Sequence, residues 1–308
     1  ARPKCSILNM RGRRVCIGTG VLTNFGSGHT ILSEAGSLTH PRTEGIMDER
    51  LKRNIGAITS EEQAILSKKT VFIAGCGGLG GFVAEMLSRI GIGKLVLCDF
   101  DEFCDSNYNR QVFCIGRTMG KNKAEGIAEL FREDNRCEVT AYAERITPLN
   151  AHILIEGCDV VVDALDNMRA RYDLQHACKR AGIPMVTGGV SHWHGHVSTI
   201  FPGDDTLKKI FGNAREEVKP SVVCFAAGVI GCNQAAEAVK ILLGRPGLRG
   251  RLLIVDLNGM MARVLPLAAP PKKVLRVNSA QSAQNRSRRR RRKHNSEVSD
   301  TVIIETDT

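Results

Sequence analysis

The chain has 308 residues, of which 43% are apolar and 24% are charged, and its formal net charge is +11. This is the composition of an ordinary globular protein, and it excludes a collagen-like or a mostly disordered chain. No run of about eighteen consecutive apolar residues occurs, so we predict neither a transmembrane helix nor a membrane partner.

The positive charge is concentrated at the two ends of the chain. Residues 1–45 carry a net charge of +4 and residues 272–308 one of +6, so the middle is almost neutral. We predict that residues 1–45 are poorly ordered or non-native, that 46–268 form one domain, and that 269–308 are a basic disordered tail. The run Arg288–Lys293 is typical of a solvated tail. Binding of a nucleic acid through it is the electrostatic alternative.

The eleven cysteines are an odd number and include no C-x-x-C pair. Several lie in apolar runs, where a free cysteine behaves as a small hydrophobic residue. This usage is typical of a reducing compartment, so we expect a cytoplasmic protein.

From residue 46 onward, short apolar runs alternate with helical patterns. We expect helices at 49–68, 82–90, 121–132, 150–156, 168–181 and 228–243, and strands at 70–74, 94–99, 138–143, 159–165, 184–187, 197–201 and 252–256. Strands that are almost continuously apolar and that alternate with helices predict parallel βαβ units. The expected fold class is therefore α/β and Rossmann-like, with a largely parallel sheet flanked by helices and mixed C-terminal strands.

A glycine-rich segment follows the first of these strands. Gly75, Gly77 and Gly80 fit the pattern G-x-G-x-x-G between a strand and a helix. Such glycines let the backbone approach a nucleotide phosphate at a helix N-terminus. Asp99 ends the next strand, where a carboxylate can accept hydrogen bonds from a ribose. The alternative is a tight strand–helix turn that binds no ligand.

Charged and amide side chains follow successive strand ends. They are Asp101, Asn107, Arg110, Lys123, Asp166 and Asn167. Fixed cations would neutralise a reacting triphosphate, a need that a dinucleotide dehydrogenase does not have. Asp166 follows a strand at the ligand-binding edge, where its oxygens suit Mg²⁺. Taken singly, Asp166 could instead cap a helix, and Arg110 and Lys123 could be solvated surface charges.

Five segments together carry a resemblance to a known family. These segments, residues 75–80, 99–101, 107–111, 120–124 and 163–167, resemble those of the ThiF/MoeB/HesA adenylyltransferases, which are relatives of the ubiquitin-activating enzymes. The resemblance extends from about residue 50 to residue 267. It implies a reaction in which ATP and Mg²⁺ adenylate the C-terminal glycine of a small ubiquitin-fold sulfur-carrier protein that ends in Gly-Gly, with release of pyrophosphate.

The resemblance also implies roles for individual residues. Asp99 would bind the ribose, Asp166 would organise Mg²⁺, and the triphosphate would contact Asn107, Arg110 and Lys123. Arg53 matches an arginine that reaches the active site of the other subunit in this family, which implies a homodimer. The remaining residues assigned to nucleotide binding are Gly75, Gly77, Gly78, Gly80, Asp101 and Asn167.

The sequence departs from the family at its zinc site. Many members bind Zn²⁺ through two C-x-x-C pairs, and these pairs are missing here, so no zinc is expected. His192, His194 and His196 could replace the cysteines if they alternate along a strand and share one face. We favour polar residues near a substrate channel or a dimer face over a metal site.

Cys224 stands where some family members have a cysteine that takes the acyl group or handles sulfur. A thiolate at a helix N-terminus would gain nucleophilicity, and an inert thiol is the alternative. We predict that adenylation does not require Cys224.

Three other functions remain open. A related branch activates a carboxylate on a modified tRNA base and closes a ring by dehydration, and the basic ends of the chain could favour RNA. A nicotinamide-dependent oxidoreductase could use the same glycine loop, although Arg110, Lys123 and Asp166 argue against it. A non-catalytic nucleotide-binding protein is the third alternative.

Overall fold

The structure, a computed structural model, describes residues 6–10, 13–17, 48–212 and 220–267. The chain divides into two compact units, residues 1–44 and 45–308. In the first unit, β1 (Ser6–Met10) and β2 (Arg13–Ile17) pair as an antiparallel hairpin, with Ser6 opposite Ile17. Both strands lie in the segment for which we predicted no regular structure. The predicted basic tail lies outside the described residues.

The second unit is built on an eight-stranded sheet with the order β10-β9-β8-β7-β6-β3-β4-β5. Five neighbouring strands are parallel: β5 (Glu138–Tyr142), β4 (Lys94–Cys98), β3 (Thr70–Ala74), β6 (Val160–Asp163) and β7 (Met185–Ser191). The antiparallel strands β8 (His194–Ile200), β9 (Arg251–Asp256) and β10 (Met261–Pro266) extend one side. This mixed, mainly parallel sheet confirms the predicted fold class.

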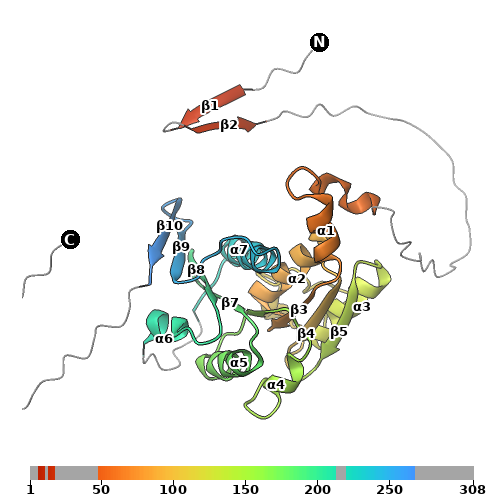
Figure 1. Ribbon diagram of the computed structural model, residues 1–308. Helices are drawn as coiled ribbons and strands as arrows, with labels where there is room; N and C mark the ends of the chain where they lie inside the picture. Colours follow the sequence, from red (N-terminus) through yellow and green to blue (C-terminus); the bar gives the residue numbers. More distant parts are fainter. Residues whose placement is uncertain (1–5, 11–12, 18–47, 213–219, 268–308) are drawn as a thin grey trace, which may run out of the picture. The chain divides into compact units, whose positions relative to one another are not determined.

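Helices cover both faces of this sheet, and Figure 1 shows the resulting three layers. One face packs against α1 (Ser60–Leu66), α2 (Gly78–Ile90), α3 (Lys123–Glu133) and α7 (Cys224–Leu242). The other face packs against α4 (Ala151–Leu154), α5 (Met168–Ala181) and α6 (Thr206–Phe211). Alternate residues of β3 therefore enter opposite cores, with Ile73 in the first and Phe72 in the second.

Four elements differ clearly from the expectation. The helix predicted at 49–68 is two short elements, the 3-10 helix η1 (Glu49–Asn54) and α1, because Gly56 at φ +104° interrupts the backbone between them. The helix predicted to start at Phe82 begins at Gly78. The polar segment after residue 203 contains α6, and β10 was not predicted at all.

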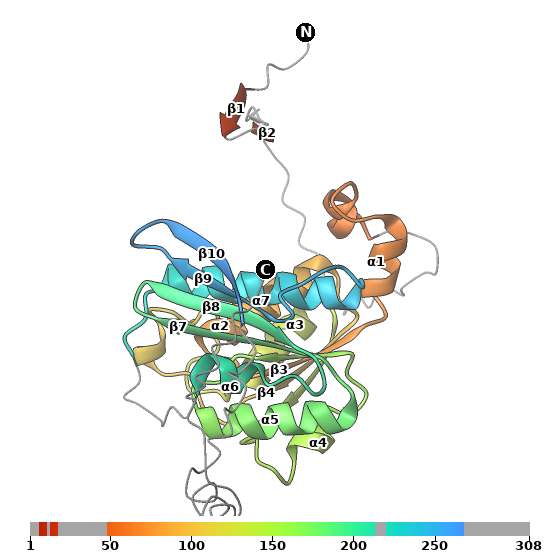
Figure 2. The same cartoon turned by 60° about the vertical axis from the view of Figure 1, so that its left-hand side comes forward.

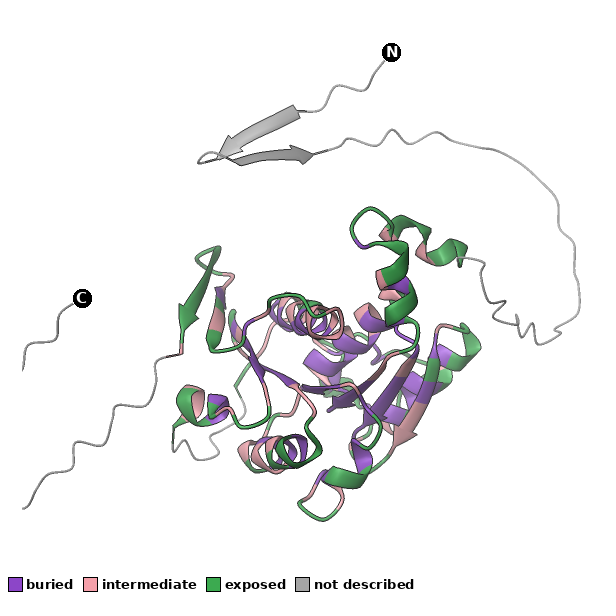
Figure 3. Cartoon of the chain, viewed as in Figure 1, coloured by how far each residue is buried: buried purple, intermediate pink, exposed green. Residues whose placement is uncertain are grey.

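Burial is uneven along the sheet. The central parallel strands β3, β4 and β6 are almost entirely buried, whereas every residue of β10 is exposed, as the burial colours of Figure 3 show. Figure 2 shows β9 and β10 together at the antiparallel end of the sheet. None of the helices in the described part of the chain has the length and apolar character needed to cross a bilayer. The edge of the sheet that matters for function is the one at which β3, β4 and β6 end.

Candidate active site

The turn between β3 and α2 requires glycine at two positions. Gly75 has φ +87°, and a Cβ there would lie 2.8 Å from the carbonyl oxygen of Ala164. A Cβ at Gly80 would lie 1.8 Å from the carbonyl oxygen of Gly75. Gly77 is the N-cap of α2 and has no capping side chain, so the first N–H groups of the helix are left for a ligand. The turn can therefore receive an anion.

The end of β4 supplies two carboxylates with different surroundings. Asp99 is 9% exposed, and its carboxylate accepts hydrogen bonds from the N–H groups of Cys76 (2.7 Å) and Asp101 (2.8 Å). Burial raises its pKa, although these two hydrogen bonds and the nearby Lys123 charge act in the opposite direction. Asp101 is partly exposed and accepts a hydrogen bond from Lys123 Nζ at 3.2 Å. Lys123 is 6% exposed, so it is not the solvated surface charge of the alternative interpretation.

The segment 107–111 lies against the glycine turn. Its Asn107 is 7% exposed and accepts a hydrogen bond from the N–H of Cys104 (3.2 Å). Arg110 places its side-chain stem beside Gly78, 3.7 Å from where a Cβ would be. Its guanidinium, however, donates within its own loop, to the Ser106 carbonyl (2.9 Å) and to Asn109 Oδ1 (2.8 Å). The structure thus brings Arg110 to the turn while its cationic group is held by neighbours.

The loop after β6 carries the predicted metal ligand. Asp166 is exposed, and it does not cap the following helix. Asn167 is the N-cap of α5, where its Oδ1 accepts a hydrogen bond from the N–H of Ala170 at 2.9 Å. The helix-cap alternative for Asp166 is therefore wrong. Ala164, two residues earlier, packs directly on Gly75, so this loop and the glycine turn are in contact.

Most predicted site residues therefore gather at one edge of the sheet. β3 lies between β6 and β4, and the chain passes to opposite sides of β3, which is the topological switch point where open α/β sheets bind ligands. Arg53 is the exception. It is exposed in η1, and its neighbour Leu51 packs against Gly91 at the far end of α2. Because α2 has 13 residues, Arg53 lies roughly 20 Å along the helix from the turn of its own chain.

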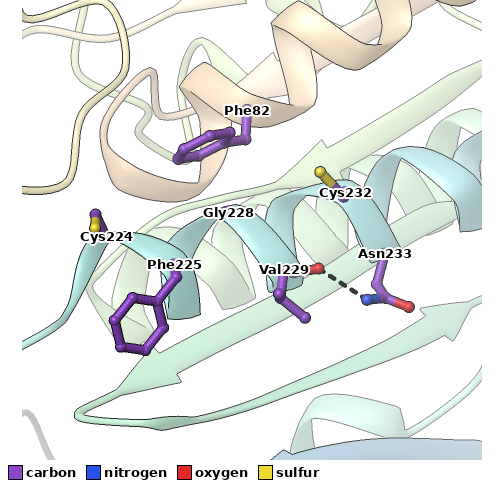
Figure 4. Close-up of a pocket in the computed structure, with 7 residues that line it drawn as sticks. All are labelled: Phe82, Cys224, Phe225, Gly228, Val229, Cys232 and Asn233. Atoms are coloured by element: carbon purple, nitrogen blue, oxygen red, sulfur yellow. Dashed lines mark hydrogen bonds between the residues drawn. The ribbon is translucent and has the colours of Figure 1, made fainter. Parts of the chain in front are cut away.

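Cys224 is exposed at the first position of α7. It borders an open apolar depression of about 470 Å³, shown in Figure 4, together with Phe82, Phe225, Val229 and Cys232. Phe82 of α2 lies over α7 there, and Asn109 Nδ2 donates to the carbonyl of Val222 (3.1 Å), just before the helix. The N-terminus of α7 is thus joined to the segment that carries Arg110.

The three histidines do not share one face. His192 has φ +54° in the turn between β7 and β8, so only His194 and His196 belong to a strand. His194 is exposed and lies 3.3 Å from Asp256, whereas His196 packs edge-on against Phe211. Burial, and then the Arg171 charge, lower the pKa of His196 to about 4. Within the described ranges, no three His, Cys, Asp or Glu side chains are arranged to hold a metal ion.

Several polar residues of this edge were not assigned a role from the sequence. Asn122 caps α3 and also donates to the carbonyls of Asp99 (2.8 Å) and Asp101 (3.2 Å). Gln111 is buried beside Gly77, and its Oε1 has no hydrogen-bond partner among the described residues. Both lie inside the quoted motifs, so the motifs could have identified them. Asp163 also lies inside one of these motifs, whereas its buried partner Arg171, beneath the β6 loop, lies in none of them.

The fold and this edge define a class of α/β protein with a glycine turn at the switch point of a mainly parallel sheet. The ThiF family model matches residues 51–276, most of the chain. The chain therefore belongs to the ThiF family.

The curated relatives point the same way. A SAMP-activating enzyme E1 from Haloferax volcanii is 34% identical over 234 residues, which cover 73% of this chain and 84% of that protein. The adenylyltransferase and sulfurtransferase MOCS3 of Sus scrofa is 33% identical over 66% of this chain, and that of Dictyostelium discoideum is 36% identical over 65%. The chain spans about half the length of these MOCS3 proteins. Relatives of this kind establish an enzyme of the adenylyltransferase class.

Solved structures support the fold. A crystal structure of E. coli MccB with ATP is 23% identical and superposes with a TM-score of 0.61, covering 73% of this chain and 74% of MccB. At this identity the likeness concerns the fold alone. It agrees with the three-layer architecture described above.

Proposed function

We propose that this chain uses MgATP to adenylate the C-terminal glycine of a small ubiquitin-fold sulfur-carrier protein ending in Gly-Gly. The observation that carries the proposal is the convergence, in a ThiF-family chain, of the glycine turn, Lys123 and the Asp166 loop at the switch point of the sheet. The names of the curated relatives, an E1 and several adenylyltransferases, support the same reaction.

The side chains present fit a nucleoside triphosphate. The uncapped N-terminus of α2 and the unpartnered Oε1 of Gln111, within the described residues, offer a donor set and an acceptor beside Gly77. Asp99 would hold the ribose, and Asn107, Arg110 and Lys123 would contact the phosphates. Asp101 and Asn167 would complete the nucleotide site. Asp166 would hold Mg²⁺, which neutralises phosphate charge when bound.

The reaction requires no general base. A C-terminal carboxylate is already ionised at neutral pH, and one of its oxygens attacks the α-phosphorus of ATP. The bond from that phosphorus to the bridging oxygen of the β-phosphate breaks, and pyrophosphate leaves. The protein contributes position and charge neutralisation, for which its fixed cations and helix N-terminus are suited.

Arg53 enters this proposal through a second copy of the chain. Its distance from the turn of its own chain means that it cannot serve that site, so we place it in the active site of a homodimer partner. The proposal also places the enzyme in a reducing compartment such as the cytoplasm, because six of the described cysteines are buried and are used as small hydrophobic side chains.

The test is ATP–pyrophosphate exchange with a panel of ubiquitin-fold proteins that end in Gly-Gly. We expect exchange that depends on Mg²⁺ and on one carrier, and no exchange with the same carrier lacking its last glycine. Exchange driven by tRNA instead would favour the dehydratase branch. Tight NAD binding without any thermal shift by ATP would overturn the proposal in favour of an oxidoreductase.

A further inference from the structure

A buried polar cluster lies directly beneath the loop that carries Asp166. Asp163, at the end of β6, is fully buried, and its Oδ2 accepts hydrogen bonds from Arg171 Nη1 (3.0 Å) and Thr187 Oγ1 (2.7 Å). Arg171 belongs to α5 and is 6% exposed, and Thr187 lies opposite Asp163 on β7. Gln234 of α7 donates to the backbone carbonyl of Asp163 (2.7 Å). Four elements therefore meet at Asp163.

The same cluster holds both ends of Leu165, the residue before Asp166. The N–H of Leu165 donates to Asp163 Oδ1 at 3.1 Å. The carbonyl of Leu165 accepts a hydrogen bond from Arg171 Nη2. That carbonyl and the N–H of Asp166 belong to one planar peptide unit. Fixing the carbonyl therefore fixes the plane from which Asp166 projects.

Arg171 can do this because its guanidinium is a rigid fork. Nη1 binds Asp163 and Thr187, while Nη2 binds the carbonyls of Leu165 and Gly188, the latter at 2.8 Å. Lysine carries a single ammonium and cannot reproduce both sets of bonds. On the other side of Asp166, the Asn167 side chain is fixed by its cap on α5. Asp166 is exposed between two anchored residues.

We infer that Arg171 is a positioning residue, which orients the Leu165–Asp166 peptide and so presents the Asp166 carboxylate to the magnesium ion of the nucleotide. The metal role of Asp166 rests on the proposed function, whereas the effect of Arg171 on the Leu165–Asp166 peptide does not. Arg171 touches no reacting atom in this scheme and acts only through Asp166.

Arg171→Lys is the informative substitution, because it keeps a cation beside Asp163 and removes the second arm of the fork. A neutral side chain would leave the buried Asp163 carboxylate unpaired and endanger folding. Thr187→Val is the matched control. It removes one hydrogen bond to the same carboxylate and one from Arg171 Nη1, and it leaves the Leu165 carbonyl bound to Arg171 Nη2.

The first measurement is amide hydrogen exchange of the nucleotide-free proteins in peptides covering residues 164–167. We expect exchange at least about tenfold faster in Arg171→Lys, and little change in Thr187→Val. Equal exchange in Arg171→Lys and the wild type would overturn the inference, whatever the enzyme turns out to catalyse.

The second measurement is the Mg²⁺ dependence of pyrophosphate exchange. Changes in residues that orient metal ligands typically weaken metal binding about 10–100-fold, so Arg171→Lys should raise the half-saturating Mg²⁺ concentration by at least about tenfold. It should leave the KM for ATP at saturating Mg²⁺ near the wild-type value. An unchanged Mg²⁺ response would overturn the inference.

A double-mutant cycle then separates the two proposals. If Arg171 acts through Asp166, adding Arg171→Lys to Asp166→Asn should have no further effect on turnover. Additive losses would show that Arg171 supports the fold generally, and would overturn the inference. An Asp166→Asn enzyme with a normal Mg²⁺ response would instead refute the metal site of the proposed function. The amide hydrogen-exchange measurement alone would then decide the role of Arg171 in the loop.

Discussion

Gly77 and Gly80 lie three residues apart in the same turn, yet a methyl group should impair different properties at the two positions, namely stability at Gly80 and ATP affinity at Gly77. At Gly80 the new Cβ would lie 1.8 Å from the Gly75 carbonyl oxygen, so the turn or α2 must shift. Overpacking of this kind costs about 3 kcal/mol or more of unfolding free energy. For a domain of this size that corresponds to a fall in Tm of roughly 6–12 °C.

At Gly77 the nearest atom to a new Cβ is Gln111 Nε2 at 3.5 Å, an ordinary van der Waals contact. Gly77→Ala should therefore change the unfolding free energy by less than about 1 kcal/mol. The methyl group would, however, stand at the N-terminus of α2, where the phosphates are proposed to bind, and we expect ATP affinity to fall at least about 100-fold, which is about 2.7 kcal/mol. Gly77→Val should block binding altogether.

The assays are thermal unfolding without nucleotide and calorimetric titration with MgATP. The two variants serve as controls for each other, because Gly80→Ala should primarily lower the Tm and Gly77→Ala should primarily lower the affinity for ATP. Wild-type ATP affinity in a folded Gly77→Ala protein would refute the assignment of the turn as a phosphate site. Wild-type stability of Gly80→Ala would refute the steric argument.

Four further predictions concern single side chains. Asp166→Ala should lower adenylation about 10²–10³-fold with little change in Tm, and a loss below tenfold would count heavily against its role. Cys224→Ala should keep pyrophosphate exchange near the wild-type rate, since the proposed adenylation needs no nucleophile from the protein and Cys224 is exposed at the first position of α7, and loss of exchange in a folded variant would contradict this. Inactive Arg53→Ala and Asp166→Ala proteins, mixed and allowed to exchange subunits, should regain about a quarter of the wild-type activity if Arg53 serves the partner's site. The pKa of His196 is about 4 in the folded chain against 6.5 when unfolded, so protons bind preferentially to the unfolded state between these values, and stability falls as the pH decreases through this window. Relative to His196→Gln, the wild type should lose about 1.5 kcal/mol of unfolding free energy between pH 6.5 and 5 in urea unfolding, and parallel curves would contradict the assignment.

Local signals explain which elements could be predicted from the sequence. The helix Met168–Ala181 was predicted to the residue, because Asn167 caps its start and Gly182, at φ +74°, ends it. The start of α2 was predicted four residues late, since glycines are poor helix formers. Its first turn is helical because it packs against α7, so closely that a Cβ at Gly231 would lie 2.8 Å from the Leu79 carbonyl. Tertiary packing of that kind has no local signature.

The residues of the site also fall into two groups, those with a local sequence signal and those that depend on tertiary packing. The positions of residues at or shortly after strand ends, such as Asp99 and Asp166, could be predicted because parallel strands end at one edge. The partners of Asp163 could not. Thr187 reaches it through the register of β6 and β7, and Arg171 reaches it from the second turn of α5. Such contacts depend on how separate elements pack, and neither residue type is distinctive at its position.

The carboxylates at the two strand ends share one arrangement. Asp99 and Asp163 are buried, accept hydrogen bonds from backbone N–H groups of the following loop, and have a pKa that burial raises. The next acidic residues, Asp101 and Asp166, are more exposed. The buried member therefore shapes the loop, and the exposed member is the one that we propose for ligand binding. Since a buried carboxylate without its partners costs far more than an exposed one, substitutions at Asp163 should reduce stability first, and substitutions at Asp166 should reduce activity first.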